Sequence, residues 1–223
     1  MNSSPAFREI YLVSLAAYTV FGGLSGPNLR PSLSAARGIA VRIPFLVSVG
    51  QSSAAETELR RFVELVFWAI YFTDHAVEWR SFAEGAGKGY SKELRRPISY
   101  AARRELAFYM DYALELMEAE PSGLGIKAIE NAKQAVKSLN AAIHAGKLAQ
   151  SGNLRPPHDD ISEGALRRFA KTHRLTFSSC SLVLAAYRRA RFDSLDAVSR
   201  SHFDWLLGST LRKNVRRGPF GLH

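Results

Sequence analysis

The chain has little of several features on which many folds depend. Its 223 residues include one cysteine, Cys180, which excludes an internal disulfide framework and a cysteine-rich zinc site. Nine prolines and 16 glycines are too few for a collagen-like or broadly disordered chain. The longest apolar runs, residues 10–21 and 62–72, are shorter than the ~20 residues of a membrane-spanning helix. We expect a globular protein without a membrane span, located inside the cell: in the cytoplasm, in a nucleoid or nucleus, or within a nucleoprotein particle.

Acidic residues are scarce beside basic ones, with 20 Asp and Glu against 30 Lys and Arg and a net charge of +10. The excess lies at the two ends of the chain. Residues 1–50 hold four basic residues and one acidic residue, and residues 151–223 hold thirteen and six. Arginine outnumbers lysine 22 to 8, and its planar guanidinium suits bidentate contacts with phosphate. The charge predicts a nucleic-acid partner, DNA or RNA; a basic surface packed against acidic neighbours is the alternative.

Apolar spacing and helix-start signals predict a mainly α-helical protein built as a multi-helix bundle. Predicted helices cover residues 5–21, 54–84, 99–120 and 126–147. The apolar segment 62–72 is expected at the centre of the core, because it is apolar nearly all round. Residues 39–49 instead predict an edge strand or a short extended arm, since Pro44 cannot donate to a strand ladder.

These elements divide the chain into three predicted regions. Residues 1–50 form an N-terminal helix and an extended basic arm, residues 51–150 a central helical bundle, and residues 151–223 a smaller Arg-rich C-terminal helical region with a basic tail. The turn-forming residues 151–158 support the second boundary. The arm, at residues 28–49, is too apolar to remain in water, so it should pack on its own body or on a neighbouring copy. Self-association or a larger complex is therefore predicted.

Residues 165–184 resemble a helix-turn-helix motif, with the small Ala170 between the two helices and Cys180 buried in the second. The resemblance departs at Arg174, where the turn usually has glycine. It implies that the second helix presents four side chains to the bases of nucleic acid: Thr176, Phe177, Ser178 and Ser181. The packing of two short helices gives the same apolar spacing and is the alternative.

The cations predicted to contact phosphates do not depend on that motif, because backbone contacts need only a basic face. The tail from residue 206 contains no acidic residue and is predicted to be mobile until it orders on a polyanion; a solvated terminus is the alternative. The predicted phosphate-binding residues are Arg167, Arg168, Lys171, Arg174, Arg188, Arg189, Arg191, Arg212, Lys213, Arg216 and Arg217.

Arg168 and His173 also fit the loose signature of the helical ribonucleases called HEPN domains, an arginine followed by histidine after four to six residues. The resemblance implies an enzyme in which His173 transfers a proton. However, Phe169 stands where that family has a polar residue, and chance accounts for the number of matching pairs in a chain with this many arginines. We therefore predict a non-enzymatic nucleic-acid-binding protein in a nucleoprotein assembly, with no metal ion or cofactor. The alternatives are a coat or scaffold subunit of an oligomer and a HEPN-like ribonuclease.

Overall fold

The computed structural model describes residues 4–26, 30–76, 78, 105–118, 123–150 and 162–217. For residues 30, 141–150 and 209–217, which lie in helices, it describes the backbone but not the side chains. Within this part of the chain every regular element is a helix, which confirms the predicted α-helical bundle. None of the described helices is long and apolar enough to cross a membrane.

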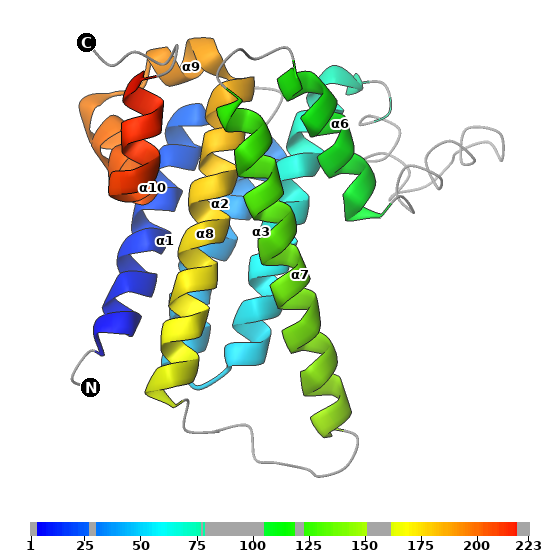
Figure 1. Ribbon diagram of the computed structural model, residues 1–223, viewed down its shortest axis with the longest axis vertical. Coiled ribbons are helices and arrows are strands. Elements are labelled where there is room, and N and C mark those ends of the chain that lie inside the picture. Colours follow the sequence, from blue (N-terminus) through cyan, green and yellow to red (C-terminus); the bar gives the residue numbers. More distant parts are fainter. Residues whose placement is uncertain are drawn as a thin grey trace, which may run out of the picture.

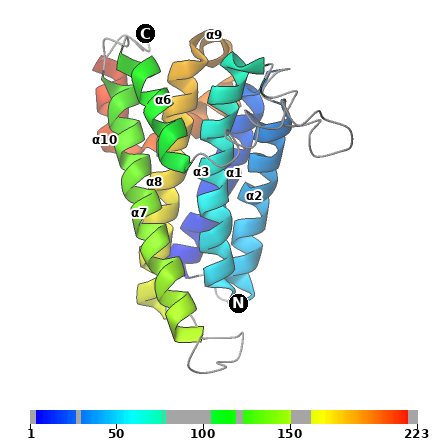
Figure 2. The ribbon, with the colours of Figure 1, turned by 90° about the vertical axis from the view of Figure 1, so that its right-hand side faces the viewer.

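Long helices run side by side along the main axis of the bundle, as Figures 1 and 2 show. Three shorter or kinked helices gather toward the end opposite the N-terminus (Figure 1). The long helices are α1 (Pro5–Leu24), α2 (Arg30–Ser48), α3 (Ser52–Asp74), α7 (Leu124–Gln150) and α8 (Glu163–Tyr187). The others are α6 (Leu106–Glu118), α9 (Arg189–Asp193) and α10 (Ala197–Arg217).

Serine caps begin two of these helices. The Ser4 hydroxyl accepts a hydrogen bond from the Phe7 N–H at 3.4 Å, and Pro5 follows at the first helical position. The Ser162 hydroxyl accepts from the Ala165 N–H at 3.2 Å. Each cap satisfies an N–H group that has no partner inside its own helix.

The predicted extended arm is wrong, because α2 occupies nearly all of residues 28–49. Its buried apolar residues recur at helical spacing: Leu33, Ala36, Ile39, Ala40, Ile43 and Val47. Pro44 lies inside the helix and removes one backbone donor. The burial of this stripe on α1 and α3 outweighs that loss and the β-propensity of the branched residues.

One contiguous core joins the described parts of the three predicted regions. Phe62 of α3 lies at its centre, with ring centroids 5.0 Å from Phe21 of α1 and 4.2 Å from Phe177 of α8. This position confirms that the apolar segment 62–72 forms the core. The division of the chain at residues 50 and 150 stays a prediction.

The ends of the helices differ from their predicted limits. α3 ends at Asp74, before the predicted residue 84, and the His75 N–H donates to the Tyr71 carbonyl there. α7 confirms the amphipathic helix predicted over residues 126–147. The predicted linker 151–158 lies outside the described residues. Residues 99–104, the first residues of the helix predicted over 99–120, also lie outside them.

Candidate nucleic-acid interface

The segment that resembles a helix-turn-helix is one uninterrupted helix, α8, so that prediction is wrong. The helix continues through Arg174, and the Thr176 hydroxyl donates to the Thr172 carbonyl at 2.8 Å. Buried residues continue at helical spacing on both sides of the predicted turn, at Phe169, His173 and Phe177. The apolar pattern therefore reflects the packing of a single central helix.

The four predicted base-contacting side chains are buried, so this prediction is also wrong. The exposed fraction is 0% for Thr176, Phe177 and Ser181 and 3% for Ser178. α8 packs against α1, α3 and α7, which cover this half of it. None of the four side chains can reach a groove of nucleic acid.

The first turns of α8 are exposed and carry Arg167, Arg168 and Lys171, which we call the α8 ridge. Arg167 forms an exposed ion pair with Glu163, with 3.1 Å between Nε and Oε1. Hydrogen bonds from Arg167 and Ser4 hold the pKa of Glu163 below its usual range, so this carboxylate remains charged. Arg168 and Lys171 have no ion-pair or hydrogen-bond partner among the described residues. Two of the three cations are therefore free to bind an anion.

The α8 ridge stands between two hollows in the surface. One, of about 570 Å³, lies between α1, α8 and α10 and is lined by Arg167. The other, of about 560 Å³, lies between α3, α7 and α8 and is lined by Arg168 and by Glu56 of α3. Lys171 lines both hollows, so the ridge is accessible from either side.

Arg174 comes from the same helix but is engaged inside the protein. Its Nη1 lies 3.1 Å from Oε1 of Glu9, and its Nη2 donates to the Trp205 carbonyl at 2.9 Å. Its guanidinium carbon lies 4.4 Å from the centroid of the Trp205 ring. These contacts join α8 to α1 and α10, and a phosphate would have to displace them.

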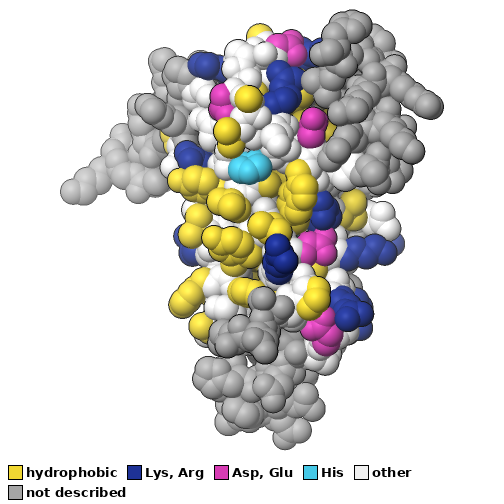
Figure 3. All heavy atoms as spheres, turned by 90° about the vertical axis from the view of Figure 1, so that its left-hand side faces the viewer, with side chains coloured by type: hydrophobic (Ala, Val, Ile, Leu, Met, Phe, Trp, Pro, Cys, Tyr) yellow, Lys and Arg dark blue, Asp and Glu magenta, His cyan; other side chains and the backbone are white. Residues whose placement is uncertain are grey.

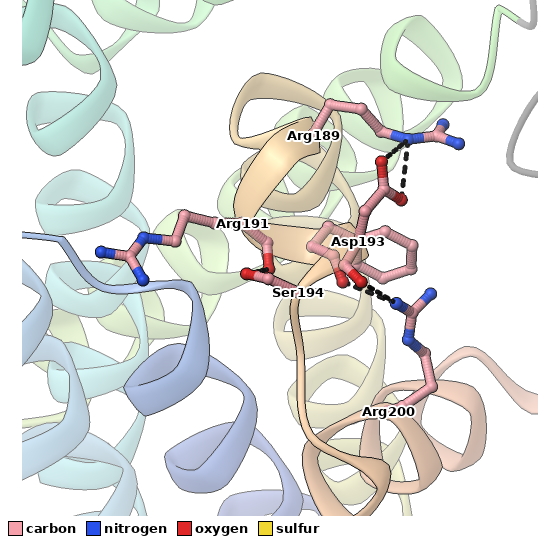
Figure 4. A network of polar contacts seen from close by, with 6 residues as sticks. Arg189, Arg191, Asp193, Ser194 and Arg200 are labelled. Atoms are coloured by element: carbon pink, nitrogen blue, oxygen red, sulfur yellow. Dashed lines mark hydrogen bonds and ion pairs between the residues drawn. The ribbon is translucent and has the colours of Figure 1, made fainter.

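The arginines after α8 form a second group around α9, seen from close by in Figure 4. Arg189 donates to both carboxylate oxygens of Asp193 at 3.1 Å. Arg200 donates to the carbonyls of Phe192 at 2.7 Å and Asp193 at 3.2 Å, and so caps the end of α9. Arg191 is exposed and points away from this network. Arg191 is thus better placed for an outside anion than the arginines in the network.

The predicted phosphate-binding residues do not form one continuous patch. Arg167 and Arg188 lie at opposite ends of α8, about 30 Å apart along a helix with a rise of about 1.5 Å per residue. Arg188 is half-buried, and its guanidinium packs against Gly26 after α1.

The backbone of the predicted basic tail is helical as far as Arg217, where α10 ends, and the mobility of the tail stays a prediction. α10 is kinked at Gly208, whose φ of 67° and ψ of −179° favour glycine. The predicted cations Arg212, Lys213, Arg216 and Arg217 lie on the helical backbone, but their side chains are outside the described part. Residues 218–223 are also outside it.

His173, the residue on which the HEPN resemblance depends, is fully buried. Its Nε2 lies 3.1 Å from the Ser14 hydroxyl of α1, and its ring contacts Phe177 with centroids 4.6 Å apart. Burial lowers the pKa of His173 to about 3, so the ring is neutral at pH 7. The side chain cannot touch an RNA strand without unfolding this part of the core.

Two acidic residues that the sequence did not single out as partners join the helices: Glu9 beside the α8 ridge and Asp74 near the other end of α8. Glu9 holds Arg174, and Asp74 accepts hydrogen bonds from the hydroxyls of Tyr112 at 2.8 Å and Tyr187 at 2.7 Å. Asp74 thereby ties α3 to α6 and α8. No local pattern signals these pairs, since the partners of Glu9 and Asp74 lie far away in the sequence.

The described residues contain no group of three or more His, Cys, Asp or Glu side chains placed to hold a metal ion. No family model matches the chain, and neither a curated protein nor a solved structure matches it.

Proposed function

We propose that this protein binds the phosphate backbone of nucleic acid through the α8 ridge, without catalysing a reaction. One observation carries the proposal: Arg168 and Lys171 are exposed, three positions apart on one helix, with no carboxylate partner among the described residues. Side chains at this spacing are neighbours on a helix surface. Cations that are not already paired keep their full attraction for phosphate.

One neighbouring side chain reduces this attraction. Glu163 opposes it, because this charged carboxylate pairs with Arg167. Arg168 and Lys171 should therefore contribute more to binding than Arg167 does.

A double substitution, Arg168→Gln with Lys171→Gln, tests the proposal by fluorescence anisotropy on labelled duplex DNA and labelled single-stranded RNA. We expect affinity to fall by on the order of 1–3 kcal/mol, the scale of two lost charge-assisted hydrogen bonds. The slope of log affinity against log salt should become shallower by about 2, since each phosphate contact contributes about 0.9 on duplex DNA. The two substrates also separate DNA from RNA as the preferred partner.

A matched control removes the same charge elsewhere: Arg61→Gln with Lys127→Gln, both exposed, on α3 and α7. This control should keep most of the affinity and of the salt slope.

Glu163→Gln should instead raise the affinity for nucleic acid, because it frees Arg167, and it should steepen the salt slope by about 1. Equal losses in the ridge variant and the control would show a general charge effect and refute the ridge as the site. A wild type that binds neither nucleic acid at low salt would refute the function.

A further inference from the structure

α1 and α2 present hydrophobic side chains on their outer face as well as on the core side. Figure 3 shows these side chains gathered on one face of the molecule, over α1 and α2. Their exposed fractions range from 36% to 65%. This surface, which we call the α1–α2 face, comprises Tyr11, Leu12, Leu15, Tyr18, Val41, Phe45 and Val49. A helix on the surface of a monomer normally turns polar residues outward, so this pattern calls for a covering partner.

The residues of the two helices form a continuous surface because the helices are antiparallel and in fixed register. The Arg37 side chain donates to the Tyr18 carbonyl at 3.1 Å, and its guanidinium lies 4.0 Å from the Tyr18 ring centroid. From this crossing, three residues back along α1 and four forward along α2 place Leu15 near Val41. Seven residues back and eight forward place Tyr11 near Phe45, each time with a difference of one residue, or about 1.5 Å of helix rise. Two apolar stripes thus run next to each other.

The exposed area is large enough for a dimer interface. The three aromatic side chains, Tyr11, Tyr18 and Phe45, are 53%, 38% and 65% exposed. At about 200 Å² per ring side chain they expose about 300 Å², and the four aliphatic residues add a comparable amount. The total of several hundred Å² is close to the ~800 Å² that each partner contributes to a stable interface.

Charge favours a protein partner over a lipid surface. Glu9 is held by Arg174, and Arg42 forms an ion pair with Glu58 at 2.9 Å. Among the described side chains of α1 and α2, which do not include that of Arg30, Arg37 is held on Tyr18 and Arg8 is the charged residue without a partner. An anionic bilayer is recognised by clusters of free cations, whereas protein interfaces are rich in Tyr, Phe and Arg and poor in Lys and carboxylates.

The face is also self-complementary. Two antiparallel helices with parallel apolar stripes can meet a second identical pair across a two-fold axis, which gives the packing of a four-helix bundle. We propose that a second copy of this chain covers the α1–α2 face and forms a two-fold symmetric dimer. This dimer does not rest on the nucleic-acid proposal.

Sedimentation equilibrium over a range of protein concentrations tests the dimer with the full chain. The wild type should dimerise, and Tyr11→Ser with Phe45→Ser should raise the dissociation constant at least tenfold. Both side chains are exposed, so the fold should survive, and circular dichroism checks this. Leu116→Ser is the control, because Leu116 is 38% exposed on α6, away from the α1–α2 face. α6 faces the viewer in Figure 2, which shows the side of the molecule opposite to that in Figure 3. A wild type that stays monomeric, or a double variant that dimerises as the wild type does, would overturn the proposal.

A labelling experiment tests directly which face is covered. Maleimide modification of Phe45→Cys should slow as protein concentration rises, while that of Leu116→Cys should not change. The buried Cys180 provides little background. Equal, concentration-independent rates would count against the dimer. Binding of a monomeric wild type to phosphatidylserine vesicles, lost in the Tyr11→Ser and Phe45→Ser variant, would reassign the face to lipid and overturn the proposal.

Discussion

Acidification should destabilise this protein specifically through His173. The ring lies in the core between Phe169 and Phe177 and shares a hydrogen bond with Ser14. Removal from water lowers its pKa to about 3, against about 6.5 in the unfolded chain. Between these values the unfolded state binds a proton that the folded state excludes. Stability from this group is therefore complete above pH 6.5 and falls as the pH decreases toward 3.

The two pKa values set the size of the effect. Each pH unit in this window costs about 1.4 kcal/mol, and between pH 7 and pH 5 the loss from His173 is about 2 kcal/mol. In a chain of 223 residues this corresponds to a shift of about 4–8 °C in melting temperature. Other groups that titrate in this range add their own terms, so the contribution of His173 must be isolated by difference.

His173→Phe and His173→Gln remove the titration, and the glutamine keeps an amide that can bond to Ser14. Thermal unfolding of each variant beside the wild type should show the difference in stability moving by about 2 kcal/mol in favour of the variant from pH 7 to pH 5. Parallel pH dependence of the wild type and both variants would refute the reasoning. It would mean that His173 is protonated in the folded protein, and that the core there is open to water.

Three further predictions concern packing and reactivity. Gly38→Ala should raise the free energy of unfolding in denaturant titrations by about 0.5–1 kcal/mol, because a Cβ there meets nothing within 4 Å and alanine favours the helix; a loss would contradict this. Gly125→Ala should lower it, because its Cβ would lie 2.7 Å from Sδ and 3.1 Å from Cβ of Met117; an unchanged midpoint would show that Met117 moves freely. Burial raises the pKa of the Cys180 thiol, so this residue should react with a thiol reagent at neutral pH only after denaturant unfolds the chain; rapid reaction of the native protein would refute its burial.

Local physics in the sequence predicted most of the helices and the centre of the core. The caps at Ser4 and Ser162 and the helical spacing in α7 act over a few residues, so they can be read without knowing what packs nearby. The all-round apolar character of residues 62–72 likewise placed α3 in the interior. The position of the α8 ridge was also predictable, since Arg167, Arg168 and Lys171 lie in the polar first turns of that helix.

Burial and pairing were decided only by the tertiary structure. The residues around Pro44 have a strand-like local preference, but they are helical because α1 and α3 cover one side of α2. Thr176 and Ser178 are buried because three other helices surround α8. The Arg174–Glu9 and His173–Ser14 contacts join residues 165 and 159 positions apart, so no local pattern contains them. Which arginines remain free for an anion depends on such pairs, because a charge already satisfied inside the protein is lost to outside partners.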